Sequence, residues 1–440
     1  MTGRERFGTR AGFVLAAVGS AVGLGNMWRF PYVTAQNGGA AFVVLYVAMT
    51  FAIGVPMMLA EFAVGRRARA APVLALRRVG GRGWAPVGVM LVLTSFIILA
   101  YLSVVAGWTI RYALDAALRG FAAAPGERFA VVSTGKLAIA YHLLSMGITT
   151  AIVVVGVRKG IERASLVLMP LLFLLLSGLA IWAATLPGAM AGYRFYLKPS
   201  LESLMDPAVL QTAASQAFYS LSVGMGIMIT YASYVSRREN LNREATVVSL
   251  SDFAVAFGAG LVVFPVIFAL GLSGQVSEST MGTLFISLPS AFAAMGGVGR
   301  VVGFVFFLAL AVAAVTSAVS LLEVVTASVI DGWGLGRRVA TLGSGLAIAL
   351  VGLAPASSLD ALAIMDRVAG EMLVVAGVFA MSLLVGWRMK DPARELLEGA
   401  SPSFQRLVPV ALFLVRYLIP PFVLVILWIS VRDAIAVAFG

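Results

Sequence analysis

Two stretches of the sequence place glycine and polar residues inside otherwise apolar segments. Residues 16–32 read AAVGSAVGLGNMWRFPY, and residues 218–234 read FYSLSVGMGIMITYASY. Each glycine destabilises a helix interior by about 1 kcal/mol relative to alanine, so these clusters predict unwound backbone. Free amide N–H groups at such a break can bind an anion, and free carbonyl groups can bind a cation. The alternative is that the glycines only allow helices to pack closely.

The chain that carries these breaks is strongly apolar. Of its 440 residues, 60% are hydrophobic and 12% are charged, whereas about 25% are charged in an average soluble domain. Apolar runs of about 20 residues, the length that spans a bilayer, recur along the chain. The composition excludes a soluble or a disordered protein and predicts an all-α polytopic membrane protein. With no cysteine and one histidine, the chain also lacks the residues for disulfides or a histidine-based zinc site.

We predict eleven membrane-spanning helices. They lie near residues 10–35, 40–65, 86–118, 136–157, 161–184, 208–236, 245–272, 300–330, 339–354, 361–387 and 407–431. With the N-terminus inside, 21 of the 32 Lys and Arg residues fall in inner loops, 7 in outer loops and 4 within or at the ends of helices. This bias predicts a cytoplasmic N-terminus and, with an odd number of spans, an extracytoplasmic C-terminus. The net charge of +12 is therefore a signal of topology, and we expect the lipid bilayer as a partner and no nucleic acid.

The two breaks lie in the first and sixth predicted spans. A separation of five spans is typical of an inverted five-helix repeat with a binding site between its halves, near the bilayer midplane. We therefore expect two repeats plus one extra helix. The predicted units are a cytoplasmic N-terminal gate segment (1–9), a first repeat (10–184), an extracellular loop (185–207), a second repeat (208–387) with an extracellular lid (277–298), and a cytoplasmic loop with helix eleven (388–440).

Several stretches in their order resemble the neurotransmitter:sodium symporter family over nearly the whole chain. The most specific is GSAVGLGNMWRFPYVTAQNGGAAF at 19–42, and the others are VPMMLAEFAVGR at 55–66, SLSVGMGIMITYASY at 220–234, DFAVAFGAGLVVFP at 252–265 and AAVTSAVSLLEVV at 313–325. The resemblance implies the leucine-transporter fold and a sodium-coupled symporter, not an enzyme. Such a protein imports an amino acid or an amino-acid-like solute by alternating access. The resemblance also implies a bacterial-type inner (plasma) membrane and a monomer that suffices for transport, with a dimer as the alternative.

The resemblance implies two co-transported sodium ions, held by oxygen atoms as a hard cation requires. The residues implied for the first ion are Ala21, Asn26, Ser220 and Asp252. The residues implied for the second ion are Gly19, Val22, Ala313, Thr316 and Ser317.

Asp252 also bears on chloride. Many chloride-dependent members of the family have asparagine at this position. The chain keeps the chloride-pocket residue types at Tyr46, Gln216 and Ser220, but it has Ala256 where those members have serine. Because a carboxylate can itself supply the negative charge, we expect transport without a chloride requirement. The alternative is that Asp252 only pairs helices or faces water.

The implied substrate site follows by the same resemblance. Its residues are Ala21, Leu24, Gly25, Ile98, Leu102, Tyr219, Ser220, Ser222, Met225, Ser317 and Leu321. The amides of Leu24 and Gly25 would bind a substrate carboxylate. The carbonyls of Ala21 and Tyr219, with Ser222, would bind the amine.

Two positions bear on the identity of the solute. Gly23 stands where amine transporters of the family carry aspartate, which favours an amino acid. Leu102 stands where the family usually has a tyrosine that bonds the substrate carboxylate, and Tyr101 is rotated from it by about 100° on a helix. A lost charge-assisted hydrogen bond is worth about 1.5–3 kcal/mol. The Leu102 departure leaves as an alternative a sodium-dependent transporter of a non-standard small organic solute. A separate alternative is a substrate-sensing membrane receptor that has lost transport.

The resemblance also implies a gate at each end of the site, because each pair joins the first-span region to a later helix and can stabilise one state over the other. The outer gate would be Arg29 with Asp366, closed over Tyr219. The inner gate would be Arg4 with Asp331, supported by Phe7 and Tyr234. Gly160 and Pro170 resemble a hinge at which span five unwinds. Glu61 is expected to support the break in the sixth span, whereas the sequence assigns no role to Glu323.

Overall fold

The computed structural model describes residues 5–121, 124–236, 239–271 and 280–439, and within these residues it contains helices and no strands. Nine of the described helical segments are long and apolar enough to span a membrane, and one bent pair makes a tenth. A further helix is interrupted in its middle, at the place of the sixth predicted span. The all-α prediction is confirmed, and the arrangement is consistent with eleven spans.

The first half of the chain forms spans one to five, with short helices between them. Its elements are α1 (Arg10–Ala21), η1 (Gly25–Arg29), α2 (Phe30–Gln36), α3 (Ala40–Met49), η2 (Thr50–Gly54), α4 (Val55–Ala68), α5 (Pro72–Gly80), η3 (Arg82–Trp84), α6 (Ala85–Leu118), α7 (Pro125–Ser133), α8 (Lys136–Val154), η4 (Val157–Glu162) and α9 (Arg163–Ala184). The segments η1, η2 and η4 are π-helical. Such wider turns within α-helices frequently occur at functional sites.

The second half contains the predicted spans six to eleven. Its elements are α10 (Ala189–Leu197), α11 (Leu201–Leu204), α12 (Pro207–Ser220), α13 (Ile227–Ala232), α14 (Leu241–Ala269), α15 (Thr280–Gly282), η5 (Thr283–Ser287), α16 (Leu288–Ala294), α17 (Gly296–Trp333), α18 (Arg337–Val351), α19 (Leu353–Ser357), α20 (Leu359–Met365), η6 (Asp366–Leu373), α21 (Val374–Leu383), η7 (Leu384–Arg388), α22 (Pro392–Leu397), α23 (Pro402–Phe413), η8 (Leu414–Leu418) and α24 (Ile419–Phe439). Helices α10 and α11 lie within the predicted extracellular loop 185–207.

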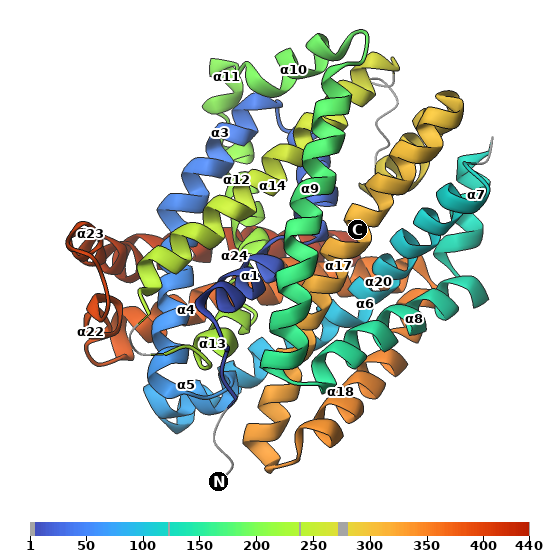
Figure 1. Cartoon of the computed structure of the whole chain (residues 1–440). Helices are drawn as coiled ribbons and strands as arrows, with labels where there is room; N and C mark the ends of the chain where they lie inside the picture. Colours follow the sequence, from blue (N-terminus) through green and yellow to red (C-terminus); the bar gives the residue numbers. More distant parts are fainter. Residues whose placement is uncertain (1–4, 122–123, 237–238, 272–279, 440) are drawn as a thin grey trace.

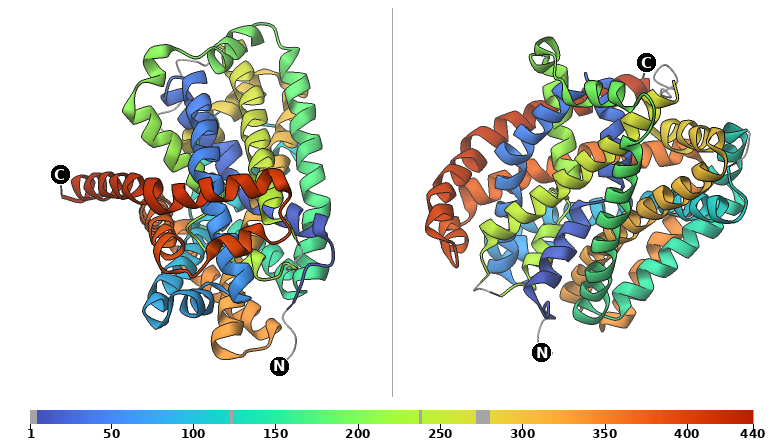
Figure 2. Two further views of the ribbon diagram at one scale, coloured as in Figure 1. Left: turned by 90° about the vertical axis from the view of Figure 1, so that its left-hand side faces the viewer. Right: turned by 45° about the horizontal axis from the view of Figure 1, so that its top comes forward.

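Helix α17 is at the centre of the bundle and packs on α6, α8, α9 and α1. The broken first span therefore lies inside the molecule (Figure 1), where α1 also contacts α14 and α13. In contrast, α23 and α24 run along one outer side of the bundle (Figure 2). We call the end that carries the N-terminal segment the inner end, and the end that carries α10 and α16 the outer end.

The lid segment is not a full span over its described part. The described residues from Thr280 onward form α15, η5 and α16, while 277–279 of the predicted lid lie outside the described residues. Tyr112 of α6 donates a hydrogen bond to the carbonyl of Phe285 at 3.0 Å. The Phe285 ring also packs against Trp108 with centroids 5.5 Å apart. These contacts anchor the segment on α6, above the interior of the bundle.

Candidate functional site

The first span breaks where its glycines predict. Helix α1 ends at Ala21, the helix resumes at Gly25, and the two parts meet at 45°. A Cβ atom at Gly23 would overlap Ser317 Oγ of α17, and one at Gly25 would lie 2.9 Å from the Tyr219 ring. The glycines therefore serve both roles that the sequence left open, because they interrupt the helix and let its neighbours approach.

The sixth span is interrupted from residue 221 to residue 226, between α12 and α13. Three residues in this stretch have left-handed φ angles: Ser222 (54°), Gly224 (81°) and Gly226 (77°). Such angles are rare outside glycine, so the two glycines are required by the backbone. Glu61 of α4 accepts a hydrogen bond from the Gly224 amide at 2.6 Å, which confirms its predicted support of this break.

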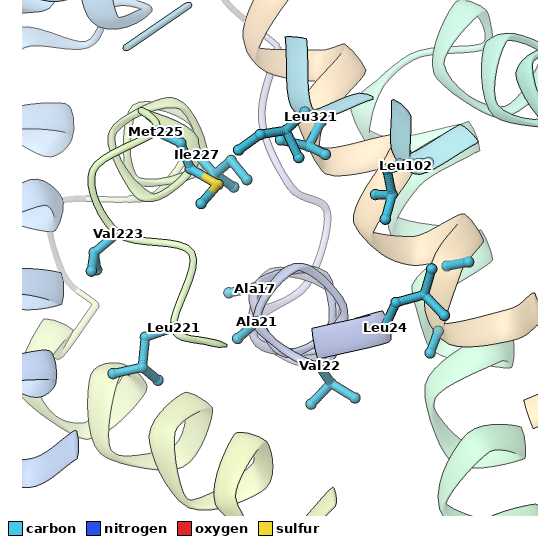
Figure 3. Packing of buried hydrophobic residues seen from close by; sticks show 14 of the residues in the cluster. Ala17, Ala21, Val22, Leu24, Leu102, Leu221, Val223, Met225, Ile227 and Leu321 are labelled. Carbon is cyan, nitrogen blue, oxygen red and sulfur yellow. The ribbon is translucent and has the colours of Figure 1, made fainter. Parts of the chain in front are cut away.

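The two breaks meet at one cavity between α1, α6, α12, α13 and α17. It is lined by Ser20, Ala21, Gly23, Leu24, Gly25, Asn26, Ile98, Leu102, Tyr219, Ser220, Ser222, Met225, Ile227, Ser317 and Leu321. All eleven residues predicted for the substrate site are in this set. Ser20 and Ile227 were missed, although both flank residues of the predicted site in the two breaks. Figure 3 shows Met225, Ile227, Leu102 and Leu321 arranged around the first-span break at Ala21 and Leu24.

The cavity is small. Its volume is about 40 Å³, which is room for about three water molecules. Its lining residues are buried except Tyr219, which is half-buried. A solute as large as an amino acid therefore requires the walls to move apart when it binds.

The side chains predicted for the first sodium ion form one buried cluster. The carboxylate of Asp252 accepts hydrogen bonds from Asn26 Nδ2 at 2.7 Å and from Ser220 Oγ at 2.8 Å. It also accepts one from the Tyr46 hydroxyl at 2.8 Å. Ala21, the remaining predicted ligand, ends α1 beside Asn26 in the same cavity wall. The cluster thus gathers carboxylate and hydroxyl oxygens, types that a hard cation takes, while the amide oxygen of Asn26 accepts a hydrogen bond from the Gly23 amide at 3.2 Å.

The residues predicted for the second sodium ion lie on two helices that touch. A Cβ atom at Gly19 of α1 would lie 3.2 Å from Thr316 Cβ of α17. The Thr316 hydroxyl donates to the carbonyl of Ala313 at 3.0 Å. Val22, whose carbonyl is also predicted for this ion, directly follows the last residue of α1. Among the described residues, the buried hydroxyl oxygen of Ser317 has no hydrogen-bond partner, which leaves it available to a ligand.

Leu102 and Tyr101 of α6 point in different directions. Leu102 lines the cavity, whereas the Tyr101 hydroxyl donates a hydrogen bond to Asp366 at 2.8 Å, toward the outer end. This is the direction change that one residue of helix rotation predicts. Tyr101 therefore does not replace the tyrosine hydroxyl that is missing at Leu102.

The predicted outer pair between Arg29 and Asp366 is not formed in this structure. Arg29 lies 3.6 Å from Glu371 instead, and its guanidinium group is 5.2 Å from the centroid of the Tyr219 ring. The physical reason is that Asp366 is held by Tyr101, while Glu371 follows on the same π-helix, η6. Sequence reasoning missed Glu371, because no pattern in the sequence marks η6 as π-helical.

The inner end is closed by aromatic and charged residues. The ring of Phe7 packs against Phe13 at 5.6 Å, Tyr231 at 5.7 Å and Tyr234 at 6.2 Å between centroids. Phe7 and Tyr234 therefore lie together, as predicted. Of the predicted ion pair, Arg4 lies outside the described residues, and Asp331 accepts a hydrogen bond from the Ala71 amide at 2.7 Å.

Glu323 and Arg337 form a buried ion pair at the inner end. The two side chains approach to 2.5 Å, and none of the Glu323 side chain is exposed. Tyr234 donates to Glu323 at 2.6 Å, and Arg337 also lies 3.3 Å from Glu5 of the N-terminal segment. Glu323, which the sequence left without a role, thus joins α17 to α18 and to Tyr234, which follows α13, and Arg337 extends the contact to the N-terminal segment.

The predicted hinge residues lie on span five beside the first span. Gly160 is in the π-helical segment η4, and Pro170 is inside α9. Met169, next to Pro170, would lie 3.3 Å from a Cβ atom at Gly19. Glu162, which sequence reasoning missed, ends η4 and accepts hydrogen bonds from Gly8 N at 2.6 Å and Thr9 N at 3.0 Å. Span five is thereby tied to the N-terminal segment.

Comparisons with known proteins agree with one another. A model of the sodium:neurotransmitter symporter family matches residues 4–121 and 130–434. An uncharacterised sodium-dependent transporter of Methanocaldococcus jannaschii is 36% identical over 358 residues, which are 77% of this chain and 72% of that protein. The uncharacterised sodium-dependent transporter YhdH of Bacillus subtilis is 32% identical, with 96% of each chain covered. The crystal structure of MhsT in complex with L-phenylalanine is 37% identical with a TM-score of 0.87, and the match covers 97% of this chain and 100% of that chain.

Proposed function

Because the chain belongs to the sodium:neurotransmitter symporter family, whose members are secondary transporters and not enzymes, we propose that it imports an amino acid with two sodium ions. Its fold is the leucine-transporter fold. The observation that carries the proposal is that all eleven predicted substrate residues line one buried cavity where the two helix breaks meet. We place the protein in the plasma membrane with the N-terminus inside. The two repeats are proposed at 10–184 and 208–387.

An amino acid fits the polar and apolar parts of the cavity. The break in the first span offers amide N–H groups at Leu24 and Gly25 for a carboxylate, since helix N-termini attract anions. Ser222 of the second break lines the same cavity, and its hydroxyl donates a hydrogen bond to the carbonyl of Ser20 at 2.9 Å. The remaining wall is apolar, with Met225 and Leu321 buried. The complex of MhsT with L-phenylalanine supports this class of solute.

Two sodium ions supply enough free energy for accumulation. Each charge that crosses 100 mV contributes about 2.3 kcal/mol, and each tenfold concentration gradient contributes about 1.4 kcal/mol. The cluster around Asp252 and the contact between Gly19 and Thr316 offer the two places for these ions. Both sites adjoin the first-span break, so sodium binding and solute binding act on the same segment.

We propose that chloride is not required. Tyr46 and Ser220, two of the residue types that form the chloride pocket in other members, both donate to the Asp252 carboxylate. A fixed negative charge therefore already occupies these donors. Uptake should remain when chloride is replaced by gluconate at constant sodium, and strict chloride dependence would contradict this part of the proposal.

The main test is uptake into proteoliposomes. An inward sodium gradient should drive accumulation of at least one amino acid, and replacing sodium with choline should abolish it. The Thr316→Val variant removes a predicted sodium ligand at nearly constant volume and should raise the half-saturating sodium concentration by at least threefold. The matched control is Thr326→Val, on the same helix and outside the cavity, which should behave like the parent. If no amino acid is accumulated, the proposal is wrong.

Leu102 gives a sharper test of how the solute is held. If backbone amides alone bind the carboxylate, Leu102→Tyr adds a charge-assisted hydrogen bond worth about 1.5–3 kcal/mol. Affinity for a small amino acid such as alanine should then rise about tenfold or more, measured by sodium-dependent thermal stabilisation. Leu102→Phe adds the ring without the hydroxyl and should not raise affinity. If no amino acid stabilises the parent in sodium, the solute is a non-standard organic molecule.

A further inference from the structure

We propose that Glu371 is a positioning residue of the outer gate, which holds Arg29 while the gate is open and releases it to Asp366 when the gate closes. The inference rests on the proposed function for the existence of a transport cycle, and it adds a residue that the predicted gate does not contain. In this scheme Arg29 changes its ion-pair partner between Glu371 and Asp366, which both lie on η6.

The helix geometry places both carboxylates on one side. Asp366 and Glu371 are five residues apart in η6, a π-helical segment with hydrogen bonds between residues i and i+5. Residues five apart in a π-helix are close to one turn apart and share a face. In an α-helix the same spacing would rotate the second side chain by about 140°. The π-helix therefore turns Glu371 toward Arg29.

This structure contains one of the two proposed contacts of Arg29, the one with Glu371. Arg29 lies 3.6 Å from Glu371, and no ion pair joins Arg29 to Asp366 among the described residues. Asp366 is held by the Tyr101 hydroxyl at 2.8 Å. A Cβ atom at Gly370 would lie 2.6 Å from Asp366 Oδ1 and 3.2 Å from Tyr101 Oη, so glycine leaves room for this carboxylate between the two helices.

The exposure of the groups suits an exchange. The Glu371 side chain is 45% exposed and that of Arg29 is 28% exposed, so their pair is weak and changes an equilibrium by only about twofold to fivefold. A weak pair on each side keeps both positions of the gate accessible. A two-state equilibrium moves only by the difference between its states. Removing the Glu371 carboxylate should therefore favour the closed gate, and removing the Asp366 carboxylate should favour the open gate.

The test measures the gate directly. The chain has no cysteine, so a single Leu102→Cys reporter in the cavity wall is the only thiol of this protein that a membrane-impermeant methanethiosulfonate can label, and labelling is read on the protein after its purification. Labelling is measured on intact cells in sodium without added solute. Glu371→Gln should slow labelling about twofold to fivefold, and Asp366→Asn should accelerate it by a similar factor. Glu371→Asp, which keeps the charge, should restore labelling toward the parent rate.

Asp360→Asn is the control, since it removes an exposed acid from the neighbouring helix α20, and its labelling should match the parent. An unchanged or faster rate in Glu371→Gln would overturn the inference, as would a shift of both gate variants in the same direction. Labelling requires no uptake and no knowledge of the solute. A protein that fails in proteoliposomes but shows these opposite shifts would refute the proposed transport and keep the gate exchange.

Discussion

The inner and outer ends of the cavity are held by contacts of different strength. At the inner end, Phe7 packs among three aromatic rings and the Glu323 carboxylate is fully buried against Arg337. At the outer end, Arg29 and Glu371 lie 3.6 Å apart with both side chains partly exposed. The contacts that close the inner end are therefore buried, whereas the ion pair observed at the outer end is solvated.

This difference indicates which end changes its contacts at lower free energy. Separating a buried carboxylate from its partner is unfavourable by several kcal/mol, whereas an exposed ion pair contributes about 0–1 kcal/mol. Opening the inner end must therefore be coupled to a larger change elsewhere. Span five offers that coupling, because Met169 touches the proposed second sodium site and Glu162 holds the N-terminal segment.

The largest expected effect follows from Arg337→Gln. The substitution leaves the Glu323 carboxylate buried without its charge partner, which is destabilising by about 3–5 kcal/mol. The inner end should open to relieve it. Labelling of the Leu102→Cys reporter in inside-out vesicles should accelerate at least tenfold, and the midpoint of thermal unfolding should fall.

The matched control for this prediction is the double variant Glu323→Gln with Arg337→Gln. It removes both charges, so no unpaired charge remains buried, and labelling should return to within a few-fold of the parent rate. If Arg337→Gln alone is labelled at the parent rate, the pair does not hold the inner end closed.

A smaller effect is expected for Glu162→Gln. This buried carboxylate accepts hydrogen bonds from two amides and one hydroxyl of Gly8 and Thr9, and hydrogen bonds to a charged group are worth about 1.5–3 kcal/mol. The neutral amide should loosen the N-terminal segment and increase trypsin cleavage at Arg6 about tenfold. Glu239→Gln is the control, because Glu239 lies 3.9 Å from Arg10 and is partly exposed. Equal cleavage of both variants would show that Glu162 does not fasten the segment.

Much of the site was predictable from the sequence because its signals are local. Gly23, Gly25, Gly224 and Gly226 mark the two breaks directly, since glycine weakens helices and adopts left-handed angles. The cavity residues on the other helices, such as Ile98 and Ser317, were predicted from the resemblance to a known family and not from the breaks. The all-α fold follows from apolar runs of membrane-spanning length.

The contacts that the sequence did not predict join residues whose proximity depends on the packed helices. Glu323 and Arg337 are on successive helices, and they meet only because α18 packs back on α17. Glu162 reaches the backbone at Gly8, more than 150 positions away. Glu371 faces Arg29 because η6 is π-helical, and composition does not distinguish a π-helix from an α-helix.

Phe7→Ala should have a moderate effect at the inner end. Each aromatic pair contributes about 0.5–1.5 kcal/mol beyond the area it buries. Because Phe7 is half-buried, we expect its ring to stabilise the closed inner end by less than three fully buried pairs would. Labelling in inside-out vesicles should accelerate about fivefold. Phe7→Leu, which keeps apolar volume without the ring, should fall between alanine and the parent. A parent rate in Phe7→Ala would remove Phe7 from the gate.

The smallest effect is expected from ionic strength, and it separates the two ends without any substitution. The Debye length falls from about 10 Å at 0.1 M salt to about 3 Å at 1 M, which weakens exposed pairs far more than buried ones. Raising choline gluconate at constant sodium should therefore slow outside labelling of the reporter by up to about twofold. The reason is that Glu371 is the more exposed of the two carboxylates proposed to pair with Arg29. Inside labelling should not change, since the Glu323–Arg337 pair is shielded from solvent. Glu371→Gln should abolish the response at the outer end, and a salt response that persists in this variant would assign the effect to other charges.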